Sequence, residues 1–261
     1  MLHSLSGFKL IYVSCFSLFI LLSCKDISRD NILDPKNPES YRAHVISLEA
    51  FVNTDNDQMF NEYMLTALQT IINRYPGKIT FMQFHRNAGE FTDSLTIPEN
   101  ENLYEQYVNK FDALKGVPDV FINGAFIRIK GSSSIETAID RIDNAIQSLL
   151  IENSFITIEP TVRRSSSKIS FSTKIARLGS ESISDIIVRA TVTEQIDPGI
   201  YTRVVRNIEN SNLIPRLAPG EQKEIKFSDV AVESGENLQV VFTVTANQSL
   251  IIHQSNEVIV P

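Results

Sequence analysis

Apolar residues in the first half of the chain recur at intervals of three and four, the period of an α-helix with one buried face. Three helices are predicted, over residues 59–75, 103–111 and 135–150. The first follows Asp55-Asn56-Asp57, a segment suited to capping a helix, and ends at Pro76-Gly77. Its apolar face is expected to begin with Met59 and Phe60.

Short apolar runs between these helices predict β-strands over residues 44–52, 78–85, 120–122 and 125–129. Asn123-Gly124 separates the last two strands and is a pair typical of hairpin turns. The resulting order, β-α-β-α-β-β-α over residues 43–152, predicts an α/β domain with a mixed sheet covered by helices.

After Glu152 the period changes from that of a helix to strict alternation of apolar and polar residues. Turn sequences such as Asp197-Pro198-Gly199 and Pro219-Gly220 separate the alternating segments. Residues 153–261 therefore predict an all-β domain, an antiparallel β-sandwich of immunoglobulin type. Its strands are expected at residues 155–162, 169–175, 186–192, 201–208, 221–227, 238–244 and 251–260.

The N-terminus has the pattern of a secretory signal peptide. Lys9 precedes an apolar run from Leu10 to Leu22, which is too short to span about 30 Å of hydrocarbon. Leu21-Leu22-Ser23-Cys24 at its end matches a lipobox, whose cysteine is acylated before cleavage. We expect a signal peptide over residues 1–23 and a lipid on Cys24 that holds the protein to a membrane.

Residues 24–42 are rich in Asp, Asn, Pro and Ser and contain few apolar residues. This composition predicts an extended tether between the lipid and the first domain. Lys25, rather than Asp, follows the lipidated cysteine, which favours the outer membrane. Lys25-Asp26 also resembles the start of the export tags of surface lipoproteins, but the sequence leaves open which face of the membrane the protein occupies.

The chain carries 31 acidic and 24 basic residues, for a formal net charge of −7. Most of the acidic excess falls in residues 43–152, so no concentrated basic surface is available for nucleic acid. The two cysteines are Cys15, in the signal peptide, and Cys24. A processed chain with Cys24 acylated would have no thiol for a disulfide, a nucleophile or a metal site.

The element order, with Gly116-Val117-Pro118 opening the third strand, resembles a thioredoxin fold. More specifically, the chain resembles a family of Bacteroidetes-type outer-membrane lipoproteins that join a thioredoxin-like domain to an immunoglobulin-like C-terminal domain. Besides the lipobox, the segments that carry the resemblance are residues 49–54, 116–124 and 237–260.

This resemblance implies a cis peptide bond before Pro118 and an edge beside it that pairs with extended peptide. The partner groove is then expected to include Asn53, Asn56, Met59, Val117 and Pro118. Many members of the family carry Cys-x-x-Cys, whose cysteines would fall near Asn56 and Met59. Because both thiols are missing here, the resemblance implies a scaffold that performs no redox chemistry.

Motifs for other chemistry are not found in the sequence. His44, His85 and His253 are scattered, and none pairs with another at the spacing of a helix-borne zinc site. Asn53–Asp57 has Gln58 where a calcium loop needs glycine. No phosphate-binding or dinucleotide-binding motif is present, so we expect neither a metal nor a cofactor.

These observations favour a non-enzymatic envelope lipoprotein that binds a protein or a glycan partner. The alternative is an envelope assembly factor or chaperone that faces the periplasm. A redox enzyme would need thiols, and no spacing of carboxylates singles out a hydrolytic pair.

Overall fold

The computed structural model describes residues 29–55, 59–196, 202–232 and 237–261. Cys24, the signal peptide and Asn56 therefore lie outside the described residues. Among the described residues, no helix is long and apolar enough to cross a bilayer.

The first half of the chain forms an α/β unit. Strand β2 is central: it runs parallel to β3 on one side and antiparallel to β4 on the other, and β4 continues antiparallel to β5. The predicted α/β architecture and the predicted hairpin are confirmed. The observed ends of the strands differ from the predicted ends by no more than two residues. The elements are β2 (Ile46–Val52), α2 (Met59–Arg74), β3 (Ile79–His85), α3 (Pro98–Asn109), β4 (Asp119–Ile122), β5 (Ile127–Lys130) and α4 (Ile135–Leu150).

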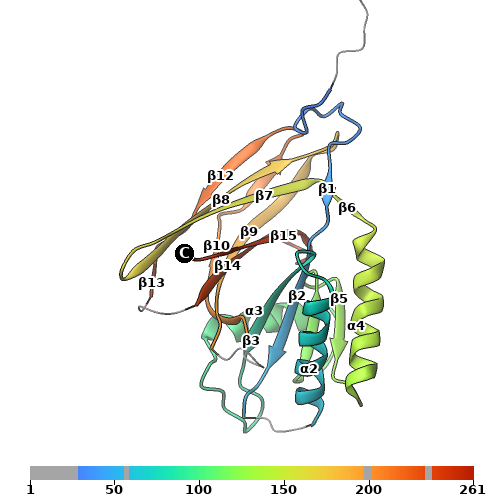
Figure 1. The fold of residues 1–261 in the computed structure, drawn as a ribbon, viewed down its shortest axis with the longest axis vertical. Coiled ribbons are helices and arrows are strands. Elements are labelled where there is room, and N and C mark those ends of the chain that lie inside the picture. Colours follow the sequence, from blue (N-terminus) through green and yellow to red (C-terminus); the bar gives the residue numbers. More distant parts are fainter. Residues whose placement is uncertain (1–28, 56–58, 197–201, 233–236) are drawn as a thin grey trace, which may run out of the picture.

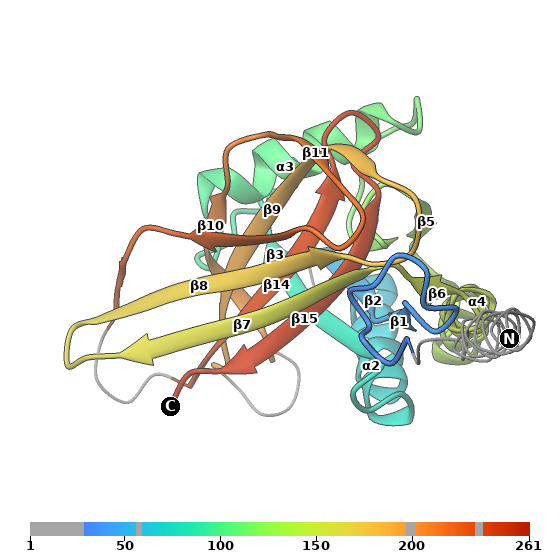
Figure 2. The ribbon, with the colours of Figure 1, turned by 90° about the horizontal axis from the view of Figure 1, so that it is seen from above.

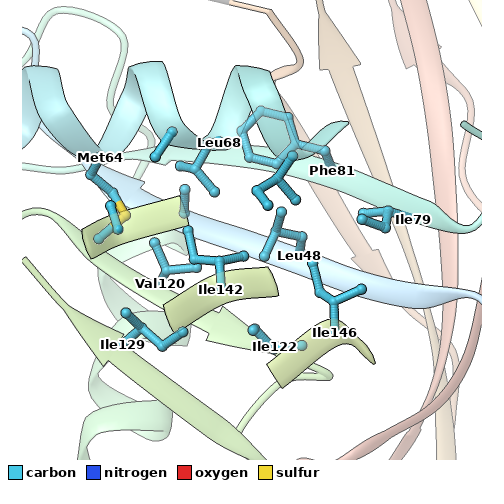
Figure 3. Packing of buried hydrophobic residues seen from close by; sticks show 14 of the residues in the cluster. Leu48, Met64, Leu68, Ile79, Phe81, Val120, Ile122, Ile129, Ile142 and Ile146 are labelled. Atoms are coloured by element: carbon cyan, nitrogen blue, oxygen red, sulfur yellow. The ribbon is translucent and has the colours of Figure 1, made fainter. Parts of the chain in front are cut away.

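Alternation along these buried strands sends side chains to both faces of the sheet. One face packs against α2 and α4, where Leu48 and Val120 meet Leu68 and Ile142 (Figure 3). The other face carries an aromatic cluster beneath α3, and the views from the side and from above place α3 opposite α2 and α4 (Figures 1 and 2). The cluster includes Phe51, Phe84, Tyr104, Tyr107 and Phe121.

The first turn of α2 differs from the sequence prediction. Met59 and Phe60 are 59% and 47% exposed, whereas Asn61 is buried and donates from Nδ2 to the carbonyl oxygen of Asn53 at 3.0 Å. The buried face of α2 begins only at Met64 and Leu65, which reach the sheet. The helix therefore starts beyond the edge of the core, and its first apolar residues face solvent.

The second half of the chain forms an antiparallel β-sandwich, and the change of architecture falls between α4 and β6, near the predicted boundary. One sheet is built around β9 and β14, the other around β8, and their inward side chains share one core. The strands are β6 (Asn153–Ser154), β7 (Ile156–Arg164), β8 (Lys168–Arg177), β9 (Ile183–Glu194), β10 (Val204–Asn210), β11 (Ile214–Leu217), β12 (Gln222–Lys226), β13 (Val230–Ala231), β14 (Leu238–Ala246) and β15 (Ile252–Ile259).

The two halves share a sheet, which the sequence did not predict. β10 pairs in parallel with β3 at Val204 and Gln83, so the order β15-β14-β9-β10-β3-β2-β4-β5 is continuous. The loop before β15 also meets the β4–β5 turn, where Ala125 N donates to Leu250 O at 3.1 Å. Gly124 is required there, because an added Cβ would lie 2.3 Å from Leu250 O.

A buried ionic cluster sits where the sandwich covers the α/β sheet. Glu49 of β2 pairs with Arg189 of β9, and both side chains are almost fully buried. Tyr107 of α3 joins them, with its hydroxyl 2.9 Å from Glu49 Oε2 and 3.0 Å from Arg189 Nη1. Burial raises the pKa of Glu49, and the neighbouring Arg189 charge opposes that shift. The cluster thus holds three elements from both halves in one place.

Residues 29–41 correct the prediction of an extended tether. They form successive turns, in which the side chains of Asn31, Asp34 and Asn37 accept hydrogen bonds from backbone N–H groups two residues on. The Ser40 hydroxyl accepts from Gly179 N at 2.8 Å, which attaches these turns to the sandwich. β1 (Arg42–Ala43) then pairs with β6. Asn and Asp favour such side-chain turns, so the polar composition here reflects local folding.

Replacing one partner of the buried pair tests whether it secures the junction. We expect Glu49→Gln to lower the free energy of unfolding by about 3–5 kcal/mol, because Arg189 would remain buried without a carboxylate. The double variant Glu49→Leu, Arg189→Met should lose less, since it buries no charge. Urea denaturation measures both, with Glu159→Gln on an exposed strand position as control. A Glu49→Gln protein as stable as the control would contradict this account.

Candidate functional site

The predicted groove residues gather at one end of the α/β unit. The carboxyl ends of β2 and β3 and the start of α2 meet there (Figure 1), and the β2–β4 register places the start of β4 beside them. Residues 29–41, drawn in blue, lie at the opposite end of the long axis (Figure 1). This end, called the cis-proline end below, is built from the loops at residues 53–55, 86–97 and 110–118.

The Val117–Pro118 peptide bond is cis, as the resemblance implied. The β2–β4 register pairs Phe51 with Asp119, so its continuation places Pro118 next to Val52. Pro118 O accepts from Gly131 N at 3.1 Å. Among the described residues, no hydrogen bond involves the N–H or C=O of Val117, which is half-buried.

Tyr104 of α3 fixes the backbone just before the cis bond. Its hydroxyl accepts from Gly116 N at 2.7 Å and lies 2.9 Å from both Gly116 O and Asp119 Oδ2. Burial and the nearby Asp119 charge raise the pKa of Tyr104 to about 12, so the phenol stays protonated and can donate. Tyr104 therefore holds Gly116 rigidly and leaves the next residue to the surface.

A second buried ion pair stands behind this loop. Asp119 is fully buried and accepts from Arg128 Nε at 3.0 Å and Nη2 at 2.5 Å. Arg128 Nη2 also donates to Leu114 O at 2.8 Å, which fixes the middle of the loop. Leu114 itself is 83% exposed. The Asp119–Arg128 pair therefore restrains the backbone at Leu114, whose side chain faces solvent.

The loop after β2 is held by a buried histidine–aspartate pair. Asp93 Oδ2 accepts from Thr54 N at 2.7 Å and lies 3.0 Å from His85 Nδ1. Asn53 donates from Nδ2 to Arg86 O at 2.8 Å and is fully buried. These contacts connect the loops that follow β2 and β3.

The predicted groove is therefore corrected in part. Asn53 is a buried structural residue and offers no side chain to a partner. Met59 is exposed at the start of α2, Val117 is half-buried and Pro118 is buried beside it. Asn56 lies outside the described residues. The available surface is thus the Val117 backbone with the exposed side chains of Met59 and Leu114.

Sequence reasoning missed Tyr104, Asp119 and Arg128 as the supports of this surface. A partial signal was present: Asp119 is the lone acid of one short apolar strand, and the strand after the turn carries two bases, Arg128 and Lys130, either of which could pair with it across the hairpin. Tyr104 falls within the helix predicted over residues 103–111, and the apolar period of that helix gives no information on what the hydroxyl contacts.

The polar side chains of the cis-proline end differ in how accessible they are. His85 and Asp93 are fully buried side chains, so the pair is out of reach of a substrate. No group of three His, Cys, Asp or Glu residues suited to a metal occurs in the described part of the chain. The apolar side chains of Met59 and Leu114 reach solvent here together with charged ones such as Lys110, Asp112 and Lys115.

Comparison with known proteins gives structural likenesses at low sequence identity. No family model and no curated protein matches the sequence. HBP35 of Porphyromonas gingivalis has a TM-score of 0.63 at 12% identity, over 84% of this chain and 76% of its own. Protein AGR_C_4864 of Agrobacterium tumefaciens has a TM-score of 0.53 at 15% identity, over 83% of this chain and 95% of its own.

A domain of the outer membrane lipoprotein Omp28 from Porphyromonas gingivalis has a TM-score of 0.33 at 19% identity, over 41% of this chain and 88% of its own, too low to support an argument. At these identities the first two likenesses show a shared fold: an α/β unit followed by a β-sandwich occurs in other proteins.

Asp93 makes the loop's stability depend on pH. Burial opposes ionisation, but the His85 hydrogen bond and charge and the Leu95 and Thr54 amides lower the pKa of Asp93 overall. A carboxylate with a lowered folded-state pKa stabilises the fold above its unfolded value of 3.8, and this stability is lost as pH falls through the folded pKa.

We therefore expect Asp93→Asn to lower the free energy of unfolding by about 1–3 kcal/mol at pH 7. The deficit should shrink as pH falls below about 4. Urea denaturation at several pH values measures it, with the exposed Asp140→Asn as control. A deficit that stays constant down to pH 2.5 would show that ionisation of Asp93 is not its cause.

Proposed function

We propose that the chain is a non-enzymatic, lipid-anchored outer-membrane lipoprotein of the Bacteroidetes type, with a thioredoxin-like unit and an immunoglobulin-like sandwich. In this proposal the cis-proline end binds an extended segment of a protein partner. The strand order β3-β2-β4-β5, the helices on both faces and the cis bond before β4 support the thioredoxin-like assignment. The likeness to HBP35 is in keeping with both units together.

The observation that carries the proposal is the free backbone at Val117. Gly116 and Pro118 on either side form hydrogen bonds, while the N–H and C=O of Val117 form none with any residue that the structure describes. An extended peptide can satisfy both groups by adding a short strand, which gives affinity without demanding a particular sequence. A rigid, preformed acceptor also reduces the entropy lost on binding.

The exposed side chains at this end favour a protein segment over a glycan. Leu114 is on the loop before the cis bond, and Met59 and Phe60 begin α2. Exposed apolar side chains on two of the elements that meet at this end can contact apolar groups of a partner. Met adapts its shape to different partners, which suits a surface that accepts several side chains.

The position of the anchor supports the same reading. Residues 29–41 follow Cys24 closely and lie at the end of the long axis opposite the cis-proline end (Figure 1). A protein held through Cys24 would then present its cis-proline end away from the bilayer. The same arrangement suits a periplasm-facing assembly factor, which is the alternative function.

Site-directed cross-linking tests the binding surface. We expect a photoreactive residue at position 114 to form adducts with a protein partner in intact cells. The same residue at position 213, where Leu213 is an exposed leucine of the sandwich, should form none. Leu114→Asp should lower the yield of a probe at Met59 by about tenfold, and Leu213→Asp should leave it unchanged. Adducts confined to residues 153–261, or adducts that glycosidase digests, would overturn the peptide site.

Substitution of each of the chain's two cysteines tests the lipid anchor. Cys24→Ala should abolish palmitate incorporation and release the protein from the outer-membrane fraction, whereas Cys15→Ala should leave both unchanged. A Cys24→Ala protein that still fractionates with the outer membrane would contradict the anchor. Protease treatment of intact cells, followed with an antibody to residues 153–261, then distinguishes an extracellular partner (signal lost) from a periplasmic assembly role (signal protected).

A further inference from the structure

A cavity of about 190 Å³ lies where the α/β unit meets the sandwich, at the end of β2 away from the cis-proline end. It is open to solvent and is lined by the segment between β1 and β2, the turn after β4, the end of α4 and the starts of β7 and β15. Six of its lining residues bear on what it could bind: His44, Phe126, Glu152, Phe155, Arg177 and His253.

Arg177, the last residue of β8, is a partly buried cation without a carboxylate partner. Its guanidinium donates to two backbone carbonyls, Glu181 O at 2.5 Å and Phe155 O at 3.1 Å. No carboxylate in the described part of the chain forms an ion pair with it, whereas Arg86, Arg128, Arg189 and Arg203, which are also buried or partly buried, each have one. Desolvation lowers the pKa of Arg177, and the Glu181 charge opposes that shift only in part.

Two imidazoles add hydrogen-bond donors to the same cavity. Asn123 Oδ1 accepts from Ser47 N at 2.9 Å, so its amide nitrogen faces His44 Nε2, 3.3 Å away. Nε2 of His44 therefore accepts, and Nδ1 carries the proton of the neutral ring. Burial lowers the pKa of His44 and of His253, so both rings are neutral near pH 7 and each retains one N–H.

The apolar side of the cavity has the size of one aromatic ring. Phe126 and Phe155 line it and are 47% and 42% exposed, which leaves ring surface uncovered. A cavity of about 150 Å³ is enough to hold benzene in a protein core. The remaining volume suffices for one carboxylate, and Glu152, exposed at the rim, disfavours a second negative charge.

We propose that this junction cavity binds a small carboxylate with a single apolar ring, the carboxylate on Arg177 beside the imidazoles and the ring against Phe126 and Phe155. The site is separate from the cis-proline end, and its occupancy does not depend on a peptide partner. The site should prefer an anionic ligand to a neutral one, because a carboxylate would neutralise the partly desolvated Arg177. A charge-assisted hydrogen bond to guanidinium is about twice as strong as a neutral one.

Benzoate and its neutral isostere benzamide are the probes. The ¹⁵N-edited imidazole spectrum of the mature full-length protein should contain three rings, from His44, His85 and His253. We expect benzoate to shift His44 and His253 progressively and to leave His85, buried at the other end of β2 and β3, unmoved. Benzamide should bind at least tenfold more weakly. Equal binding of the two probes, or no shift at His44 and His253, would overturn the proposal.

Variants of Arg177 separate a binding role from a structural one. Arg177→Gln should remove the preference for benzoate over benzamide, and Arg177→Lys should keep most of it, because lysine retains the charge. Arg163→Gln, at an exposed position of β7, is the matched control and should bind as wild type. Phe126→Ala should weaken both probes alike. An Arg177→Gln protein that still folds, by its thermal melt, and still prefers benzoate would show that Arg177 is not the anion site.

Discussion

The buried pair of Glu49 and Arg189 is the constraint on which the rest of the structure depends. An isolated buried charge on either strand would cost several kcal/mol, so Glu49 and Arg189 can both be buried only because they pair. Tyr107 completes the cluster from α3 and fixes that helix against both. The α/β unit and the sandwich consequently form one packed body, with β3 and β10 paired in a common sheet.

Local periodicity predicted most elements because it depends on neighbours in sequence. The 3.6-residue period found α2 and α4, and alternation found the long strands β8, β9 and β14. The joining of the sheets involves residues more than a hundred positions apart, such as Glu49 and Arg189, and no local pattern records such a pairing. The sequence did contain one indication of this pairing: Glu49 is the lone acid of one buried strand, and Arg189 is the lone base of another. Each buried charge needs an opposite charge beside it.

The cis bond of the candidate site was predicted, and the residues that support its loop were missed. The cis bond before Pro118 was implied by the resemblance to a thioredoxin fold and is present in the structure. Asn53 was expected at the surface, but its amide is used to join the loops after β2 and β3. Whether a polar side chain serves the fold or a ligand depends on which groups the fold brings to it, and single-sequence reasoning does not supply that information.

The two proposed sites stand at opposite ends of the same central strand. His44 precedes β2 and Asn53 follows it, and between them the strand is fully buried and paired on both sides. A ligand at the junction cavity would raise stability by RT ln(1 + [L]/Kd), since that cavity exists only when both units are in place. Such stabilisation needs no movement at the cis-proline end. The rigid junction therefore favours sites that act independently, each formed by the fold and each open to solvent.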